Sequence, residues 1–141
     1  MGKISESIAF LSCENIVAIN KDHLEKSGEE YFGADNIRNR KSLLWVLEII
    51  QHPVFFNNNQ YPTIFDKASL ICWTIINSHT FYDGNKRTGM SAMIVFLRLN
   101  DENIKLEENE IVDMALNIVD YRKTGITREE LAQWLEDNTI N

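Results

Sequence analysis

Apolar residues recur every three or four positions along most of the chain, which is the spacing of amphipathic helices. The segments with this spacing cover about 13–27, 40–51, 65–78, 86–100 and 111–119, and the residues after Thr127. Ser12 is placed to cap the first helix, and Thr127 with Glu130 forms a capping box for the last. The segment 65–78 is apolar on nearly every side, as in a central buried helix. The pattern predicts an all-α fold.

The segment 40–51 also carries apolar residues all around its surface, so we expect this helix to be well covered. Tryptophan has a large aromatic side chain that favours burial, so we predict Trp45, Trp73 and Trp134 as core residues. His23 falls on the polar side of the first helix, and we expect it at the surface.

The stretch HPVFFNNNQYPTIF, 52–65, interrupts the helical pattern. It contains both prolines of the chain and three consecutive asparagines, which are poor helix formers. Valine and phenylalanine before the asparagines are typical of strands. We therefore expect a short β-hairpin or an irregular flap here.

Composition narrows the class of protein. With 141 residues and 44% hydrophobic residues, we expect 1–141 to be a single domain that needs neither disulfides nor a structural metal. The net charge of −7 argues against direct nucleic-acid binding. Cys13 and Cys72 lie far apart, and no apolar stretch is long enough for a signal or a membrane span. A cytoplasmic protein without a membrane partner is the expectation.

The stretch HTFYDGNKRTG, 79–89, gathers polar groups between two predicted helices. It is either a solvated turn or a loop whose side chains converge on one ligand. Phe81 can anchor the loop in the core, and Gly84 permits a tight turn or the close approach of a ligand.

The order of these polar residues favours an anion site. Lys86 and Arg87 fall on the first turn of a helix, where cations oppose the helix dipole unless an anion such as phosphate offsets them. Asp83 offers a hard oxygen ligand for Mg²⁺, and His79 can act as a general base. Together these groups suit phosphoryl or nucleotidyl transfer. Taken singly, each residue also has an ordinary structural explanation, as a helix end, a turn or a solvated charge.

This stretch resembles the signature of the Fic/Doc superfamily, whose pattern is His, any, Phe, any, Asp or Glu, Gly or Ala, Asn, Gly or Lys, Arg. The matching positions are His79, Phe81, Asp83, Gly84, Asn85, Lys86 and Arg87. The similarity extends over about 15–135 and is to the death-on-curing (Doc) toxin branch. It implies a small all-α bundle with a β-hairpin flap.

The resemblance also implies roles and cofactors. ATP and Mg²⁺ would be the cofactors, and His79 would activate a hydroxyl on a target protein. The expected catalytic residues are His79 and Arg87, the metal ligand is Asp83, and the phosphate-binding residues are Gly84, Asn85, Lys86 and Arg87. A flap at about 53–60 would align the target through Phe55, Phe56, Asn57 and Asn58.

Three departures bear on the reaction. Members of the superfamily that transfer AMP usually have Pro, Gly and a second Arg where this chain has Thr80, Lys86 and Met90. These departures resemble the Doc toxin, a kinase that phosphorylates a threonine of elongation factor Tu, although Gly84 stands where that toxin has Ala. The expectation is phosphorylation of a Ser or Thr hydroxyl. AMP transfer (AMPylation) and a catalytically inactive interaction module are the alternatives.

Many members of the superfamily also carry a self-inhibitory helix with Ser or Thr four residues before Glu. The candidate positions here are occupied by Phe10, Arg98 and Ile104. The resemblance therefore implies a separate antitoxin protein, which would dock one helix or extended segment in an exposed apolar groove.

Overall fold

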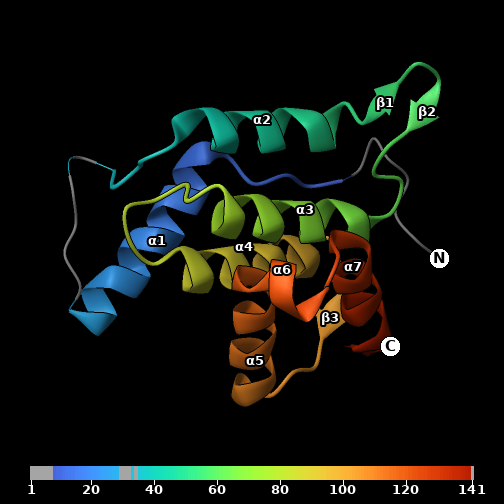
Figure 1. Cartoon of the computed structure of the whole chain (residues 1–141). Coiled ribbons are helices and arrows are strands. Elements are labelled where there is room, and N and C mark those ends of the chain that lie inside the picture. Colours follow the sequence, from blue (N-terminus) through green and yellow to red (C-terminus); the bar gives the residue numbers. More distant parts are fainter. Residues whose placement is uncertain (1–7, 29–32, 34, 141) are drawn as a thin grey trace.

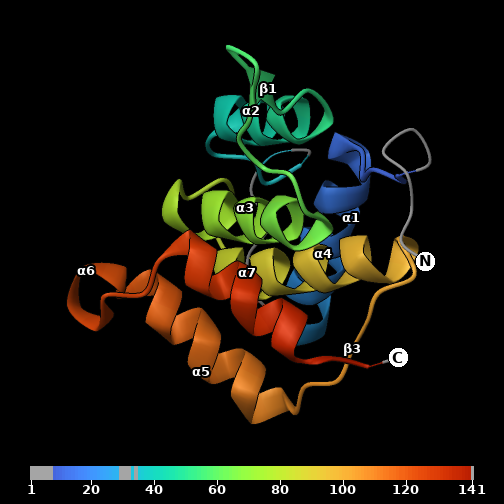
Figure 2. The ribbon, with the colours of Figure 1, turned by 90° about the vertical axis from the view of Figure 1, so that its right-hand side faces the viewer.

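Helix α3, Ile64–Asn77, lies at the centre of the fold (Figures 1 and 2). The structure is a computed structural model that describes residues 8–28, 33 and 35–140. Helices α2, α4, α5 and α7 all pack against α3, and α1 packs against α4. Nine of the fourteen residues of α3 are buried, as its apolar surface predicts. The all-α prediction is confirmed.

The other helices start and end close to the predicted positions. They are α1 (Cys13–Ser27), α2 (Arg40–Gln51), α4 (Asn85–Leu99), α5 (Glu108–Val119), α6 (Tyr121–Thr124) and α7 (Arg128–Asp137). Local capping sets several of these starts. Ser12 accepts a hydrogen bond from the Asn15 N–H to begin α1, and Thr127 accepts one from Glu130 to begin α7.

The predicted hairpin is present between α2 and α3. Strand β1, Val54–Phe55, pairs antiparallel with β2, Asn58–Asn59. The two turn residues, Phe56 and Asn57, both have positive φ (51° and 63°), as a tight two-residue hairpin turn requires. The hairpin projects beyond the end of α2 (Figure 1), and Phe56 is 88% exposed.

Helix α2 is less covered than its composition suggests, so that prediction is wrong. Its buried residues form a single stripe against α3: Leu43, Val46, Leu47 and Ile50. Leu44 and Trp45 lie on the outer side, and Trp45 is 49% exposed. The prediction of a core Trp45 fails because α2 sits at the edge of the bundle (Figure 1), with an apolar surface wider than its contact. Trp73 and Trp134 are partly buried against the core.

Two short features were not predicted. Helix α6 has only four residues, and its Tyr121 ring packs 5.3 Å from the ring of Trp73. Strand β3, Asn103–Ile104, pairs antiparallel with β4, Thr139–Ile140. Segments this short carry too few residues to show a periodicity. Of the helices in the described part of the chain, none combines the length and the apolar character needed to cross a bilayer.

Candidate functional site

The polar stretch begins in the loop between α3 and α4. Its anchor Phe81 is fully buried, as predicted, and Thr80 beside it is fully buried too. His79 has a positive φ of 48°, a left-handed conformation that costs free energy for a residue with a side chain. The surrounding contacts must therefore hold the backbone of His79 in place.

A strand-like segment just before α2 provides much of that hold. The backbone N–H groups of Arg38 and Asn39 donate to the carbonyl of Thr80 at 2.8 and 3.0 Å. On the other side of Phe81, the Tyr82 N–H donates to the Asn36 carbonyl at 3.1 Å. These bonds fasten the backbone on both sides of the anchor residue.

Side chains at the start of α2 add to this hold. Asn39 caps α2 by accepting from the Ser42 N–H, and its Nδ2 donates to the carbonyl of Ser78 at 3.1 Å. The Ser42 and Thr80 hydroxyls lie 2.8 Å apart. The start of α2 is thus tied to the end of α3, and His79 lies between the tied residues.

Asn85, the first residue of α4, closes the loop with its side chain. Its Oδ1 accepts from the Phe81 N–H and its Nδ2 donates to the Phe81 carbonyl, both at 2.8 Å. This places the amide group against the loop backbone. The predicted phosphate contact of Asn85 stays a prediction, and its backbone N–H at the helix start is the group that suits it.

Gly84 is the N-cap of α4 and adopts the left-handed conformation, with φ of 79°. A Cβ atom here would lie 3.0 Å from Asn20 Nδ2 and 3.2 Å from Leu24 Cδ2 of α1. No side chain caps α4 and no acidic residue lies in its first turn, in contrast to α1, α3, α5 and α7. The first turn of α4 therefore carries two cations, Lys86 and Arg87, at the positive end of the dipole, and the Asp83 carboxylate just before the N-cap accepts from the Gly84 N–H at 2.9 Å.

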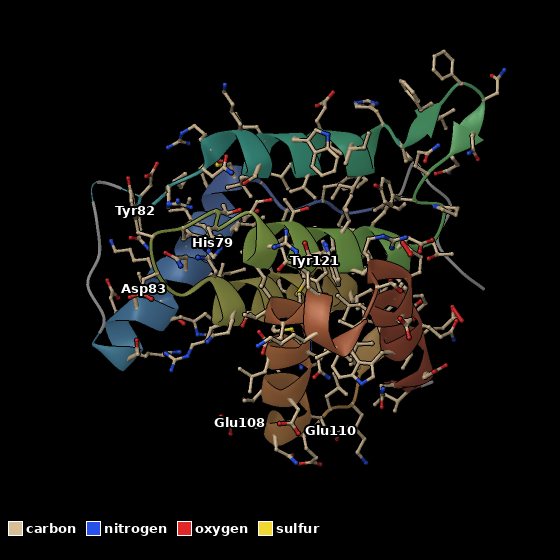
Figure 3. All side chains as sticks on the ribbon, in the orientation of Figure 1. His79, Tyr82, Asp83, Glu108, Glu110 and Tyr121 are labelled. Atoms are coloured by element: carbon tan, nitrogen blue, oxygen red, sulfur yellow. The ribbon has the colours of Figure 1, made fainter. Side chains whose placement is uncertain are left out.

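The predicted polar residues share one cavity of about 370 Å³. Its lining includes His79, Asp83, Gly84, Asn85, Lys86 and Arg87, together with Ile76, Asn77, Tyr82 and Val119. Figure 3 shows His79, Tyr82 and Asp83 at the same end of the molecule, on the loop between α3 and α4. His79, Asp83, Lys86 and Arg87 therefore line one common cavity, and the catalytic, metal and phosphate roles expected of them stay predictions.

The structure does not bring the hairpin to this cavity. Phe55, Phe56, Asn57 and Asn58 precede α3, whereas the loop with His79 follows it, and a 14-residue helix spans about 21 Å. Figure 1 shows the hairpin and the loop at opposite ends of α3. A role of the hairpin in positioning the target remains a prediction, and it requires a target long enough to span α3.

One further polar residue of the cavity was missed by the sequence reasoning. Asn77, the last residue of α3, lines the cavity, and its Nδ2 atom is buried without a hydrogen-bond partner among the described residues. A buried amide donor without a partner is costly, so it suits an oxygen of a bound ligand. In the sequence, only the position of Asn77, two residues before His79, indicates that it could line the site.

A second, larger cavity adjoins the first through Lys86 and Arg87. It measures about 680 Å³ and lies between α1, α4 and α5. His23 lines it from α1, with Nε2 2.8 Å from the Ser91 hydroxyl of α4. Burial lowers the pKa of His23; the charge of Asp22 opposes this shift, and the charges of Arg87 and Lys26 add to it.

The donor set suits magnesium shared with phosphates. No cluster of three or more His, Cys, Asp and Glu side chains that could hold a metal occurs among the described residues. Asp83 is the acidic side chain that lines the smaller cavity. Mg²⁺ commonly uses one or two carboxylates and completes its shell with substrate phosphates and waters. The residues present therefore fit a Mg²⁺–nucleotide complex.

Comparison with known proteins shows which proteins the chain is similar to. A model of the Fic/DOC family matches residues 10–97. A curated relative, "Toxin Doc" from Mycolicibacterium smegmatis (strain ATCC 700084 / mc(2)155), is 34% identical over 59 residues. The alignment covers 42% of this chain and 44% of the relative, so the chain spans less than half the length of that protein.

The contact between Gly84 and α1 can be measured as stability. Gly84→Ala should lower the free energy of unfolding by about 1 kcal/mol for the left-handed backbone, and by roughly 1–3 kcal/mol more for the clash with α1. The control is Gly125→Ala, because Gly125 has a similar φ of 77° but an open surrounding. Urea unfolding of both variants would show the difference, and equal losses would contradict the contact.

The left-handed backbone at His79 makes a second prediction. His79→Gly should unfold at higher urea concentration than His79→Ala, by about 1 kcal/mol, because only glycine adopts this φ without strain. At the preceding residue, Ser78, with φ of −94°, the same pair of substitutions should show no gain for glycine. If His79→Ala were as stable as His79→Gly, the strain would be absent.

Proposed function

The chain belongs to the Fic/DOC family, and we propose that it is a Doc-like toxin that transfers the terminal phosphate of ATP to a Ser or Thr hydroxyl of a target protein. The observation that carries the proposal is the cavity shared by His79, Asp83, Lys86 and Arg87 at a helix N-terminus that no side chain caps. A translation elongation factor, such as elongation factor Tu, is the proposed target.

The first turn of α4 would bind the phosphates. Its backbone N–H groups and the positive end of its dipole attract a phosphate group. Arg87 can hold two phosphate oxygens at once, and Lys86 adds a point charge. Gly84, with no side chain, lets the phosphate approach the backbone closely. The charge conflict at this helix start is relieved when the nucleotide binds.

The transfer itself needs a proton acceptor and charge neutralisation. His79 takes the proton from the target hydroxyl as its oxygen forms a bond to the terminal phosphorus, and ADP leaves with the electrons of the broken P–O bond. Asp83 would hold Mg²⁺, which neutralises phosphate charge when bound. The strapped loop backbone keeps the imidazole and the carboxylate at the same cavity, so little reorganisation is needed during the reaction.

The surroundings of Thr80 and Met90 support phosphate transfer over AMP transfer. Thr80 is buried and its hydroxyl contacts that of Ser42, so its side chain helps to hold the loop in place. Met90 is 2% exposed, with its sulfur 3.5 Å from that of Cys72. A buried methionine provides no cation where AMP-transferring relatives place a second Arg. Lys86 fills space at the position where those relatives have glycine.

Transfer can be tested with purified elongation factor Tu, ATP and Mg²⁺, followed by intact-mass spectrometry. We expect the mass of one phosphate on the target with wild type. His79→Ala should slow transfer by roughly 10²- to 10⁴-fold while still binding Mg²⁺–ATP, because only the proton acceptor is lost.

Other outcomes separate the alternatives. Phosphate and adenylate additions differ by hundreds of daltons, so an adenylated target would support AMP transfer. Undiminished transfer by His79→Ala would contradict the assigned base. Absence of Mg²⁺–ATP binding by wild type in calorimetry would favour an inactive interaction module.

The larger cavity is the groove proposed for a separate antitoxin protein. Its lining includes six apolar residues, Met90, Ile94, Ile111, Val112, Ala115 and Leu116. The charged or titratable residues of the lining are mostly basic: His23, Lys26, Lys86 and Arg87 outnumber Glu108. A segment with one apolar side and acidic residues complements this surface. Because Lys86 and Arg87 line both cavities, such a segment would compete with the phosphates of ATP.

The groove is testable by sequencing the neighbouring reading frames and co-expressing the chain with any small protein found there. Leu116→Glu should weaken co-purification at least tenfold, because it adds charge to the apolar wall. Leu99→Glu is the control, since Leu99 is equally exposed (47% against 48%) but lies outside the groove. Retention of the partner by both variants would place its binding elsewhere.

A further inference from the structure

Three fully buried polar residues lie beside the loop between α3 and α4. Asn20 of α1, Asn36 before α2 and Thr88 of α4 each have no exposed surface. Fully buried amides are uncommon and are expected to be hydrogen-bonded. Here the hydrogen-bond partners lie at both ends of one short segment, 83–88.

Asn20 connects the two ends of that segment. Its Nδ2 donates to the Asp83 carbonyl at 2.9 Å and to the Thr88 hydroxyl at 3.0 Å. Residues 84–87, between these two contacts, include the cations and the helix start assigned to phosphate. A single amide therefore sets the separation between the Asp83 peptide and the first turn of α4.

Asn36 supports Asn20 from the other side. Its Nδ2 donates to Asn20 Oδ1 at 2.9 Å and lies 3.3 Å from the Asp83 carbonyl. Asn36 has a left-handed φ of 59°, which asparagine tolerates better than most residues. The Asp83 carbonyl thus receives two amide donors, and its carboxylate accepts from the Gly84 N–H at 2.9 Å.

Close packing around Gly84 leaves this arrangement little freedom. An added Cβ would meet Asn20 Nδ2 at 3.0 Å, so the turn lies directly against α1 at the amide. Rotation of the Asp83 peptide would break both amide contacts at once and leave buried polar groups unpaired, which is costly.

We propose that Asn20, supported by Asn36, is a positioning residue that holds the Asp83 carboxylate and the start of α4 in the geometry that binds Mg²⁺–nucleotide. The inference rests on the proposed function for its ligand. Neither asparagine lines the cavity, so both act through the loop backbone.

Asn100 offers a matched control at the opposite end of α4. It is 4% exposed, and its amide bonds the backbone of Ala9 and the carbonyl of Phe96. Asn100→Ala removes as many amide bonds as Asn20→Ala does, but far from the cavity. Loss of stability should therefore be similar, whereas loss of ligand binding should differ.

Calorimetry of Mg²⁺–ATP binding, below the melting temperature of every variant, provides the test. Asn20→Ala should weaken binding at least tenfold and raise the Mg²⁺ concentration needed for half-maximal binding. Asn100→Ala should stay within twofold of wild type. Equal weakening in both variants, or unchanged binding in Asn20→Ala, would overturn the inference.

A second measurement separates this inference from the proposed function. Backbone hydrogen exchange at Tyr82 and Thr88 should accelerate at least tenfold in Asn20→Ala and not in Asn100→Ala. Asn36→Gly, which suits the left-handed φ, should show the same local effect if Asn20→Ala does not fold. If wild type binds no Mg²⁺–ATP, the proposed function fails. Unchanged exchange in the folded variant would instead overturn the positioning role.

Discussion

The site depends on the backbone hydrogen bonds that hold the loop between α3 and α4 against the segment before α2. The Thr80 carbonyl accepts two backbone N–H groups, from Arg38 and Asn39, while Phe81 beside it is buried in the core. Without these bonds the left-handed backbone at His79 would relax, because nothing local favours it. Hydrogen bonds from a segment about 40 residues earlier therefore offset the backbone strain at His79. That segment does not line the cavity, but it supports the loop that does.

The start of α4 presents a second constraint, of charge. Acidic side chains in the first turn complement the dipoles of α1, α3, α5 and α7, whereas α4 has glycine as its N-cap and Lys86 and Arg87 in its first turn. The larger cavity shares these two cations with the smaller one. Under the proposed function, the nucleotide phosphate and an acidic segment of the partner would use the same two cations, and this overlap would allow inhibition by competition.

Local signals account for what could be predicted from the sequence. Helix starts such as Ser12 and Thr127 carry their own caps, and the signature residues lie so close in sequence that one short loop must bring them together. Features that depend on packing between distant segments could not be predicted. The exposure of Trp45 depends on what covers α2, and the hairpin is remote from the cavity because α3 lies between them. The hydrogen bonds from Arg38 to Thr80 and from Asn20 to Asp83 join residues far apart in the sequence, and no periodic pattern in the sequence indicates such pairs.

The central claim is that His79, Asp83 and the cations of α4 surround one anionic group. A crystal structure with Mg²⁺ and a non-hydrolysable ATP analogue tests it most directly. The account predicts the metal on the Asp83 carboxylate, phosphate oxygens at Arg87 and the α4 N-terminus, and the His79 imidazole facing the terminal phosphate. A nucleotide bound elsewhere, with the 370 Å³ cavity empty and Asp83 without a metal, would contradict it.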